Sequence, residues 1–379
     1  MIARMPTRIQ SICTYPVVYP VEGRFKFFES PDGRPMGRPA VIVKITTDDG
    51  TVGWGECVPS QRWSYETLES VHSTIETYLK PELIGMNPHD AEAIHTRMNL
   101  AIAGSFSTGS PICKAGIDLA LFDLTGKLLN QSATERWRRN DKQTVTLSWT
   151  LNPLTLRDAE EDIAKAHARG YRHFNIKVAP DPAFDLELCG LARRLAPDAV
   201  IWCDANGGYD LPRALEVAPR LADLGMLALE QPVPPNRLSW FGEVRRQGAL
   251  PVIMDEGVVS TVELEEFHRL GLLDGVAIKV ARCGGLTEAR RQVEFLESNG
   301  LMFLASGLTD PDLSLAASLA LFGAYGLEHP AALNGPQFLA KSVLAQPLQI
   351  DRDVATIPQG PGLGVDVDEA EIESIRVTA

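Results

Sequence analysis

The sequence has no apolar run that approaches the roughly 20 residues needed to span a bilayer, and residues 1–8 carry no apolar stretch of the kind a signal peptide needs. It also has no Cys-x-x-Cys pair and no cluster of cysteines. The six cysteines are scattered as Cys13, Cys57, Cys113, Cys189, Cys203 and Cys283. This pattern argues against a disulfide framework and a zinc site, and it predicts reduced, mostly buried thiols in a cytoplasmic protein.

Positive charge is also scarce, because 36 lysines and arginines face 49 aspartates and glutamates, which gives a net charge of −13. An excess of negative charge argues against nucleic acid or an anionic membrane as the main partner. Clustered carboxylates can instead bind a hard cation. The 45% hydrophobic content and the length of 379 residues are typical of a globular protein with one large barrel or two ordinary domains.

From residue 144 onward, apolar segments that resemble buried strands alternate with helical patterns at nearly even intervals. Such an alternation is typical of a parallel sheet covered by helices. The even number and even spacing of the segments favour a (β/α)8-type barrel, with an open doubly wound sheet as the alternative. The predicted strands are 144–150, 173–178, 199–204, 226–230, 251–255, 275–279, 301–305 and 325–329.

The first 135 residues have a different pattern, which predicts an α+β capping domain that precedes the barrel. We expect strands over 7–15, 40–47 and 51–55, with a hairpin turn at Asp48-Asp49-Gly50. Helical patterns cover 65–83, 90–101 and 111–129. The predicted domains are therefore a capping domain (1–135), a barrel (136–340) and a C-terminal segment (341–379) that packs back on the capping domain.

Polar residues end several of the predicted barrel strands. In a barrel of this kind the active site lies at the carboxyl ends of the strands. Three neighbouring strands end in Asp204, Glu230 and Asp255, and three carboxylates this close would repel one another unless a cation neutralised them. A set of oxygen ligands without His or Cys favours Mg²⁺, or Mn²⁺, over Zn²⁺. The alternative is that each carboxylate caps a helix or pairs with a lysine.

Two lysines end the strands that flank this group. Lys177 and Lys279 fall on the second and sixth strands, which lie on opposite sides of an eight-stranded ring. A substrate carboxylate bound to the metal would have one ammonium group on each face, which suits removal of its α-proton to give a metal-stabilised enediolate. The alternatives are that the lysines form salt bridges to the carboxylates, or that Lys177 forms a Schiff base as in barrel aldolases.

The motifs that contain these residues resemble the enolase superfamily and, within it, the muconate lactonizing enzyme subgroup. They are GWGECVP (53–59), NIKV (175–178), CDANGGY (203–209), LEQPV (229–233), MDEG (254–257) and AIKVARCGG (277–285). The lysine on strand six distinguishes this subgroup from the mandelate racemase type, which has a His on strand seven where this chain reads MFLASG (302–307).

The resemblance implies a role for each matching residue. Asp204, Glu230 and Asp255 would bind Mg²⁺, and Lys177 and Lys279 would form the acid/base pair. Asn206 and Glu256 would orient these groups. The family is also commonly oligomeric, so we expect a homo-oligomer.

Asn175 is a departure from the family pattern, which usually has Lys-x-Lys on the second strand. Residues two apart on a strand share a face, so Asn175 should point inward beside Lys177. Loss of a neighbouring cation should leave the pKa of Lys177 higher than in a typical member. It also frees space or hydrogen-bonding groups for a particular substrate.

The substrate-contacting residues are harder to predict from sequence. Loops 21–39 and 59–65 should fold over the barrel, where Arg62 and Trp63 are candidates to contact substrate, although Arg62 is equally consistent with a solvated loop residue. Glu328, expected at the end of strand eight, favours a substrate with an ammonium group, unless it pairs with a lysine. His329 beside it is more typical of a structural residue.

Three functions remain open at this point, and two of them act on a small-molecule carboxylate. The first is a racemase or epimerase that moves the α-proton of an amino-acid derivative or dipeptide between two lysines. The second is a dehydratase, for example of hydroxyproline or a hydroxy acid, or a cycloisomerase that uses the same intermediate. The third is a barrel without catalytic activity, which the intact set of carboxylates and lysines argues against.

Overall fold

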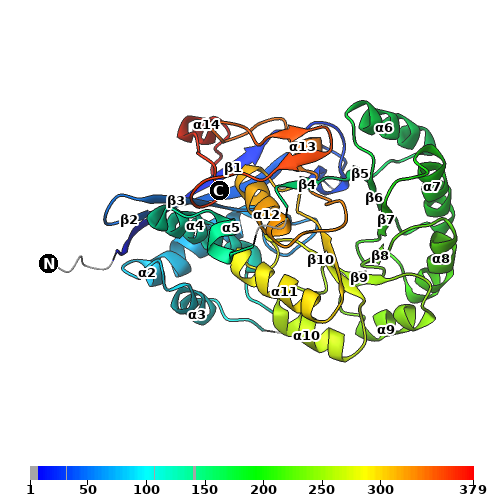
Figure 1. Cartoon of the computed structure of the whole chain (residues 1–379), viewed down its shortest axis with the longest axis horizontal. Helices are drawn as coiled ribbons and strands as arrows, with labels where there is room; N and C mark the ends of the chain where they lie inside the picture. The colour runs from blue at the N-terminus through cyan, green and yellow to red at the C-terminus, as the bar shows by residue number, and fades with distance from the viewer. Residues whose placement is uncertain (1–6, 31, 106, 140–141) are drawn as a thin grey trace.

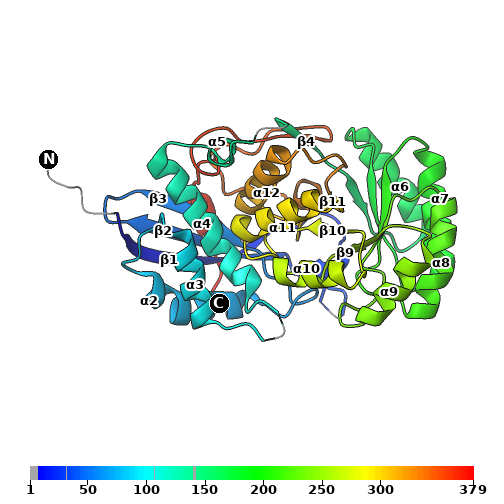
Figure 2. The same cartoon turned by 60° about the horizontal axis from the view of Figure 1, so that its bottom comes forward.

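The computed structural model describes residues 7–30, 32–105, 107–139 and 142–379, so most of the segment in which no signal peptide is expected lies outside the described residues. Two parts are visible in Figures 1 and 2: a small sheet with its helices on the left, and a curled sheet ringed by helices on the right. No helix among the described residues combines the length and the apolar character that crossing a membrane requires.

The capping part is an antiparallel sheet in the order β1-β2-β3, covered by helices. Long helix α4 packs directly on β3, and two glycines of β3 permit this close approach. A Cβ at Gly53 would lie 2.3 Å, and one at Gly55 2.1 Å, from a backbone oxygen of the helix. The expected strands and helices of this part are confirmed. The elements are β1 (Ile9–Tyr19), η1 (Lys26–Phe28), β2 (Arg38–Thr47), β3 (Val52–Cys57), α1 (Leu68–Thr74), η2 (Ile75–Leu79), α2 (Lys80–Leu83), α3 (Ala91–Ala101), α4 (Pro111–Leu129) and α5 (Ala133–Trp137).

The second part is a curled parallel sheet of seven strands in the order β11-β10-β9-β8-β7-β6-β5, which confirms the predicted barrel-type α/β fold. A helix follows each strand. The strands are β5 (Trp149–Leu151), β6 (Phe174–Lys177), β7 (Ile201–Asp204), β8 (Leu229–Glu230), β9 (Val252–Met254), β10 (Gly275–Ile278) and β11 (Met302–Ala305). The helices are α6 (Leu156–Ala168), α7 (Pro182–Leu195), α8 (Leu211–Asp223), α9 (Leu238–Gln247), α10 (Thr261–Arg269), α11 (Leu286–Ser298) and α12 (Asp312–Ala324).

The eighth position of the ring is where the sequence prediction is wrong. Residues 325–327 form the turn that caps the end of α12, since the N–H of Tyr325 donates to Leu321 O and that of Leu327 to Phe322 O. The chain reaches the ring only later, where Ala331 forms a parallel bridge with Leu147 and Ala332 forms one with Ser306. These two short bridges connect the edges of the seven-stranded sheet.

The segment at 144–150, expected as one strand, is divided between two sheets. Its first half is β4 (Thr144–Thr146), which pairs with β13 (Val354–Thr356) and, through it, with β12 (Ile350–Asp351) in a separate antiparallel sheet. Only the second half enters the barrel as β5. The remaining helices are α13 (Gly335–Phe338) and α14 (Glu369–Ser374).

The C-terminal segment returns to the capping sheet. The N–H of Val18 donates to Ile375 O at 3.1 Å, and Lys44 on β2 forms an ion pair with Glu369 on α14. Its strands β12 and β13 also pair with β4 beside the barrel. This segment therefore contacts both parts of the molecule.

The interior of the barrel is filled by apolar side chains. One side chain from each of several strands, together with Ala332 from the bridging segment, forms a separate buried cluster: Trp202, Ala228, Ile253, Ala277, Leu304 and Ala332. Because these side chains fill the middle of the ring, polar groups at the carboxyl ends of the strands have a closed, apolar floor beneath them.

Candidate active site

Three carboxylates meet at the carboxyl ends of adjacent strands. Asp204 ends β7, Glu230 ends β8, and Asp255 follows β9 directly. One oxygen from each lies within 4.8 Å of the other two, and all three side chains are buried, at 1% exposure or less. The structure thus brings together the three residues that were predicted from sequence to bind a metal.

The chemistry of this cluster fits a divalent cation. Oε1 of Glu230 is buried without a hydrogen-bond donor among the described residues, while Oε2 accepts from Trp202 Nε1 at 2.9 Å. Burial, reinforced by the charge of Asp204, raises the pKa of Glu230 to about 8. A bound cation would stabilise the ionised form that burial and the neighbouring charge disfavour, so the three carboxylate oxygens are suited to hold one.

Lys177 and Lys279 lie on opposite sides of this cluster. Lys177 Nζ donates to Asp204 Oδ2, and Lys279 Nζ donates to Asp255 Oδ2 and lies 3.7 Å from Glu230 Oε1. Burial acts to lower the pKa of Lys177, but the charges of Asp204 and Glu230 outweigh it and raise that pKa. The salt bridges considered as an alternative are thus present, and they place both ammonium groups next to the carboxylates.

Asn206 forms hydrogen bonds with the carboxylates of both Asp204 and Glu256. Asn206 Nδ2 donates to Asp204 Oδ2 and to Glu256 Oε1, each at 3.1 Å. Its backbone N–H also donates to Asp204 Oδ1 at 2.8 Å. Burial and the charge of Asp255 raise the pKa of Glu256 to about 8. Asn206 therefore fixes the orientation of Asp204 and connects it to the end of β9.

Two further residues hold Asp255, and neither was singled out from the sequence. Arg282, which is 1% exposed, donates from Nη1 to Asp255 Oδ1 and from Nη2 to Ala277 O. Gln231 Oε1 accepts from the N–H of Asp255 at 2.9 Å and from that of Gly257 at 3.2 Å. Both lie inside the quoted motifs. Gln231 directly follows the predicted ligand Glu230, which was an available signal, whereas no local pattern connects Arg282 with Asp255.

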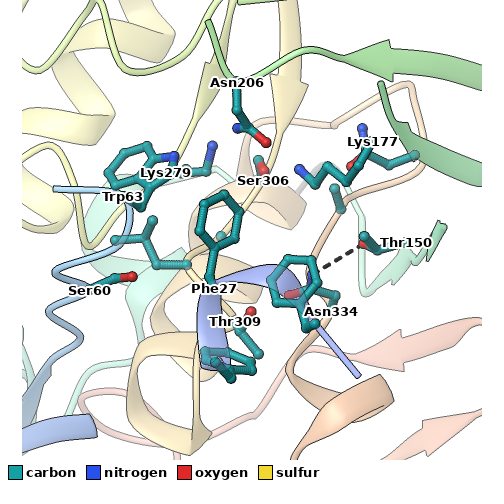
Figure 3. A pocket seen from close by; sticks show the side chains of 16 residues that line it. Phe27, Ser60, Trp63, Thr150, Lys177, Asn206, Lys279, Ser306, Thr309 and Asn334 are labelled. Carbon is teal, nitrogen blue, oxygen red and sulfur yellow. Dashed lines mark hydrogen bonds between the residues drawn. The ribbon is translucent and has the colours of Figure 1, made fainter. Parts of the chain in front are cut away.

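A cavity lies above the cluster and is roofed by the capping part (Figure 3). Lys177 and Lys279 point into it from opposite sides, with Ser306 between them. Among its described lining residues these lysines carry the only formal charges. The lining also includes Phe25, Phe27, Phe28, Ser60, Trp63, Thr150, Asn175, Asn206, Gly307, Leu308, Thr309, Ala332 and Asn334.

The roof comes from the two loops that were expected to form a lid. Phe25 stacks on Phe338 with ring centres 4.9 Å apart, and it also contacts Phe27 and Phe28 edge to face. Trp63 lies beside Lys279, whose Nζ is over the Trp63 ring. Lys26, between the phenylalanines, is close enough to Lys177 for burial and that charge to lower its own pKa to about 8. The structure therefore adds a third ammonium group near the site.

Two expected substrate contacts lie elsewhere. Arg62 is exposed and donates from Nη1 to Glu29 O at 2.8 Å, so it joins the two lid loops and does not line the cavity. Glu328 is exposed and borders a separate hollow with Asp274 and Leu301, residues that precede β10 and β11. That hollow is at the amino ends of the strands. The expectation that Glu328 contacts substrate is therefore wrong, because it followed from the wrong position of strand eight. His329 borders the same hollow.

A capping sheet over a curled parallel sheet, with three carboxylates and two lysines at the strand ends, defines an enolase-like protein. The family model "Enolase C-terminal domain-like" matches residues 158–371, and that of the "Mandelate racemase / muconate lactonizing enzyme, N-terminal domain" matches residues 36–135. The chain belongs to this family, in the muconate lactonizing enzyme subgroup of the enolase superfamily, which confirms the resemblance.

Two of the relatives that this chain resembles are isomerases of different kinds. An N-succinyl-L-Arg/Lys racemase of Bacillus cereus is 28% identical over 341 residues, covering 89% of this chain and 90% of the relative. A chloromuconate cycloisomerase of Cupriavidus necator is 29% identical over 338 residues, with 88% and 90% covered. The crystal structure of the B. cereus racemase aligns with a TM-score of 0.88 and 27% identity, covering 98% of each chain.

Proposed function

We propose that the protein is a Mg²⁺-dependent enzyme that removes the proton α to a carboxylate, and that it racemises or epimerises an amino-acid derivative or dipeptide. The observation that carries this proposal is the placement of Lys177 and Lys279 on opposite sides of one carboxylate cluster and of one cavity. Two bases that face the same α-carbon from opposite sides are what inversion requires.

Each residue of the site has a distinct role in this proposal. Asp204, Glu230 and Asp255 would hold the cation, which supplies positive charge to the carboxylate oxygens where negative charge develops. One lysine accepts the α-proton, and the other donates a proton to the opposite face. Asn206, Glu256 and Arg282 keep the carboxylates oriented. The phenylalanines and Trp63 exclude water from the reacting carbon.

A dehydratase or cycloisomerase remains the second candidate. Both reactions start with the same proton removal or its reverse, but they can proceed with one lysine. The observation that favours this alternative is Asn175, which takes the place of the first lysine of the usual Lys-x-Lys and lines the cavity beside Lys177. The side of the cavity that carries Lys177 therefore lacks the second cation of the usual pattern, so the two lysines have different surroundings, which suits a reaction that uses only one of them as a base.

The test is exchange of the α-proton with solvent. The enzyme is incubated with Mg²⁺ in D₂O with amino acids, N-acyl amino acids, dipeptides, proline analogues and acid sugars, and ¹H NMR follows the α-proton. The proposal predicts exchange with inversion for at least one class, and its loss in Glu230→Gln. A product with a new alkene, imine or ketone would establish the second candidate. Absence of exchange with every class would contradict both.

A further inference from the structure

One corner of the cavity contains buried amide groups whose hydrogen-bonding capacity is not used. Asn175 on β6 is 1% exposed and Asn334, just before α13, is 6% exposed; both line the cavity. Asn175 Nδ2 and Asn334 Oδ1 have no hydrogen-bond partner among the described residues. Leaving such groups unpaired costs free energy, so a native protein keeps them where a ligand or water can satisfy them.

Thr150 holds this corner rigid. Asn334 Nδ2 donates to Thr150 Oγ1 at 3.1 Å, as Figure 3 shows. The side-chain amide of Gln337 donates to the carbonyl of Thr150 and accepts from its N–H, both at 2.9 Å. Thr150 also pairs with Asn175 across adjacent strands. The two asparagines are therefore anchored to the same backbone position.

The corner carries no formal charge. Among the described lining residues, charge is confined to Lys177 and Lys279, which belong to the reacting centre. Each of the two asparagines instead offers the cavity one neutral unpaired atom, which is Nδ2 of Asn175 and Oδ1 of Asn334 among the described residues. Phe25, Phe27 and Phe28 provide the apolar wall of the cavity.

We infer that Asn175 and Asn334 form a subsite for a neutral amide of the substrate, so that the substrate is a carboxylate whose nitrogen is acylated by an uncharged, apolar group. An amide offers one donor and one acceptor, which matches one free acceptor and one free donor in the corner. The acyl substituent then packs on the phenylalanines. This inference rests on the proposed function for the position of the carboxylate.

A second charged group in the substrate is the main competing chemistry. Lys26 is the residue that would bind a second carboxylate, since it is half-buried near Lys177 and has no ion-pair partner among the described residues. However, its Nζ lies over the Phe27 ring, 5.1 Å from the centre, and it does not line the cavity. The geometry therefore favours the neutral amide over the dianion.

The experiment compares binding of three ligands with one side chain: N-acetylphenylalanine, N-succinylphenylalanine and phenylalanine, each racemic. Calorimetry with Mg²⁺ present measures each affinity for the wild type, Asn175→Leu and Asn334→Leu, with folding checked by circular dichroism. Asn152→Leu is the matched control, because Asn152 Nδ2 is also buried and unpartnered but borders a different hollow beside Arg24 and Lys165.

We expect the wild type to bind the N-acetyl compound at least about tenfold more tightly than the other two, and each subsite variant to lose about that factor for it alone. The control should match the wild type. Tighter binding of the N-succinyl compound, equal binding by all variants, or no binding of any of the three would overturn the inference. If the binding selectivity holds but no α-proton exchanges in D₂O, the proposed function fails and the subsite stands. If α-protons exchange equally well in ligands with and without the amide, the subsite fails and the proposed function stands.

Discussion

Lys279 Nζ lies 5.2 Å from the centre of the Trp63 ring, so an ammonium group of the barrel meets an aromatic face of the lid. Lys279 is 3% exposed, and a cation over an aromatic ring is stabilised more strongly when water is excluded. The lid therefore forms one wall of the environment in which this lysine would exchange its proton.

Trp63→Ala should slow α-proton exchange because it admits water and removes the ring from Lys279. We expect a decrease in kcat/KM of about tenfold, in line with a desolvated cation–π contact. Tyr78→Ala serves as the control, since Tyr78 is 56% exposed on η2 and lies outside the cavity lining. Equal exchange rates in wild type and Trp63→Ala would contradict the role of the lid.

The single-lysine variants distinguish two-base inversion from one-base chemistry. If each lysine serves one face, Lys177→Ala and Lys279→Ala should each abolish exchange from one enantiomer and lower racemisation by about 10²–10⁴-fold. Each should retain exchange of the opposite enantiomer. The measurement is the initial rate of deuterium incorporation into separated enantiomers. Loss of exchange from both enantiomers in both variants would exclude independent bases.

Asn175→Lys restores the cation that the family usually has beside the second-strand lysine. A positive charge next to Lys177 disfavours its protonated form, so the pKa of Lys177 should fall. The limb of the pH–rate profile that reports this base should move to lower pH than in wild type. Profiles of kcat/KM against pH measure the shift, and a limb that does not move would show that Asn175 has no influence on the base.

Most of the fold could be predicted because seven of the barrel strands are short apolar segments bounded by turns, a pattern that local sequence determines. The exception is instructive. Tyr325 and Leu327 are apolar and follow a plausible spacing, but they belong to the turn that caps α12, whose own residues are buried on all sides. A helix without a polar face has no periodic signal, so its end could not be distinguished from a strand.

The reacting centre was also accessible from sequence, because residues at the ends of parallel strands converge whatever the details of the fold. Asp204, Glu230 and Asp255 do converge. Residues whose role depends on distant partners were not accessible: Arg282 reaches back to Asp255, and Asn334 bonds to Thr150 from the far end of the barrel sequence. These contacts form only when the strands close into a ring, and no local sequence pattern encodes that closure.

Glu56 connects the capping sheet to the barrel and should make stability depend on pH. It is buried, accepts from Tyr19 Oη at 2.8 Å and from the N–H of Ser314 at 3.1 Å, and burial together with the charge of Asp312 raises its pKa to about 8. Between pH 4.5, the ordinary pKa of a glutamate, and about pH 8, Glu56 is protonated in the folded protein and loses this proton on unfolding. Its stabilising contribution is present below that value and is lost as pH rises through about 8.

Glu56→Gln mimics the protonated carboxyl group and should remove this dependence. Between pH 5 and pH 8 we expect the Tm of the wild type to fall by about 5 °C more than that of the variant. Calorimetric scans at several pH values measure the difference. Glu216→Gln, whose side chain is 60% exposed, is the control and should follow the wild type. Parallel curves for wild type and Glu56→Gln would show that Glu56 is ionised when folded.

Binding of Mg²⁺ tests the central claim most directly, because it requires no knowledge of the substrate. Isothermal titration of the wild type should show one ion per chain, bound more tightly as pH rises from 6 to 8 and Glu230, with its pKa of about 8, releases its proton. Glu230→Gln should bind at least about 100-fold more weakly, while Glu328→Gln, altered at the opposite end of the barrel, should bind like wild type. Equal binding by Glu230→Gln and the wild type, or no binding by the wild type at millimolar Mg²⁺, would contradict the account.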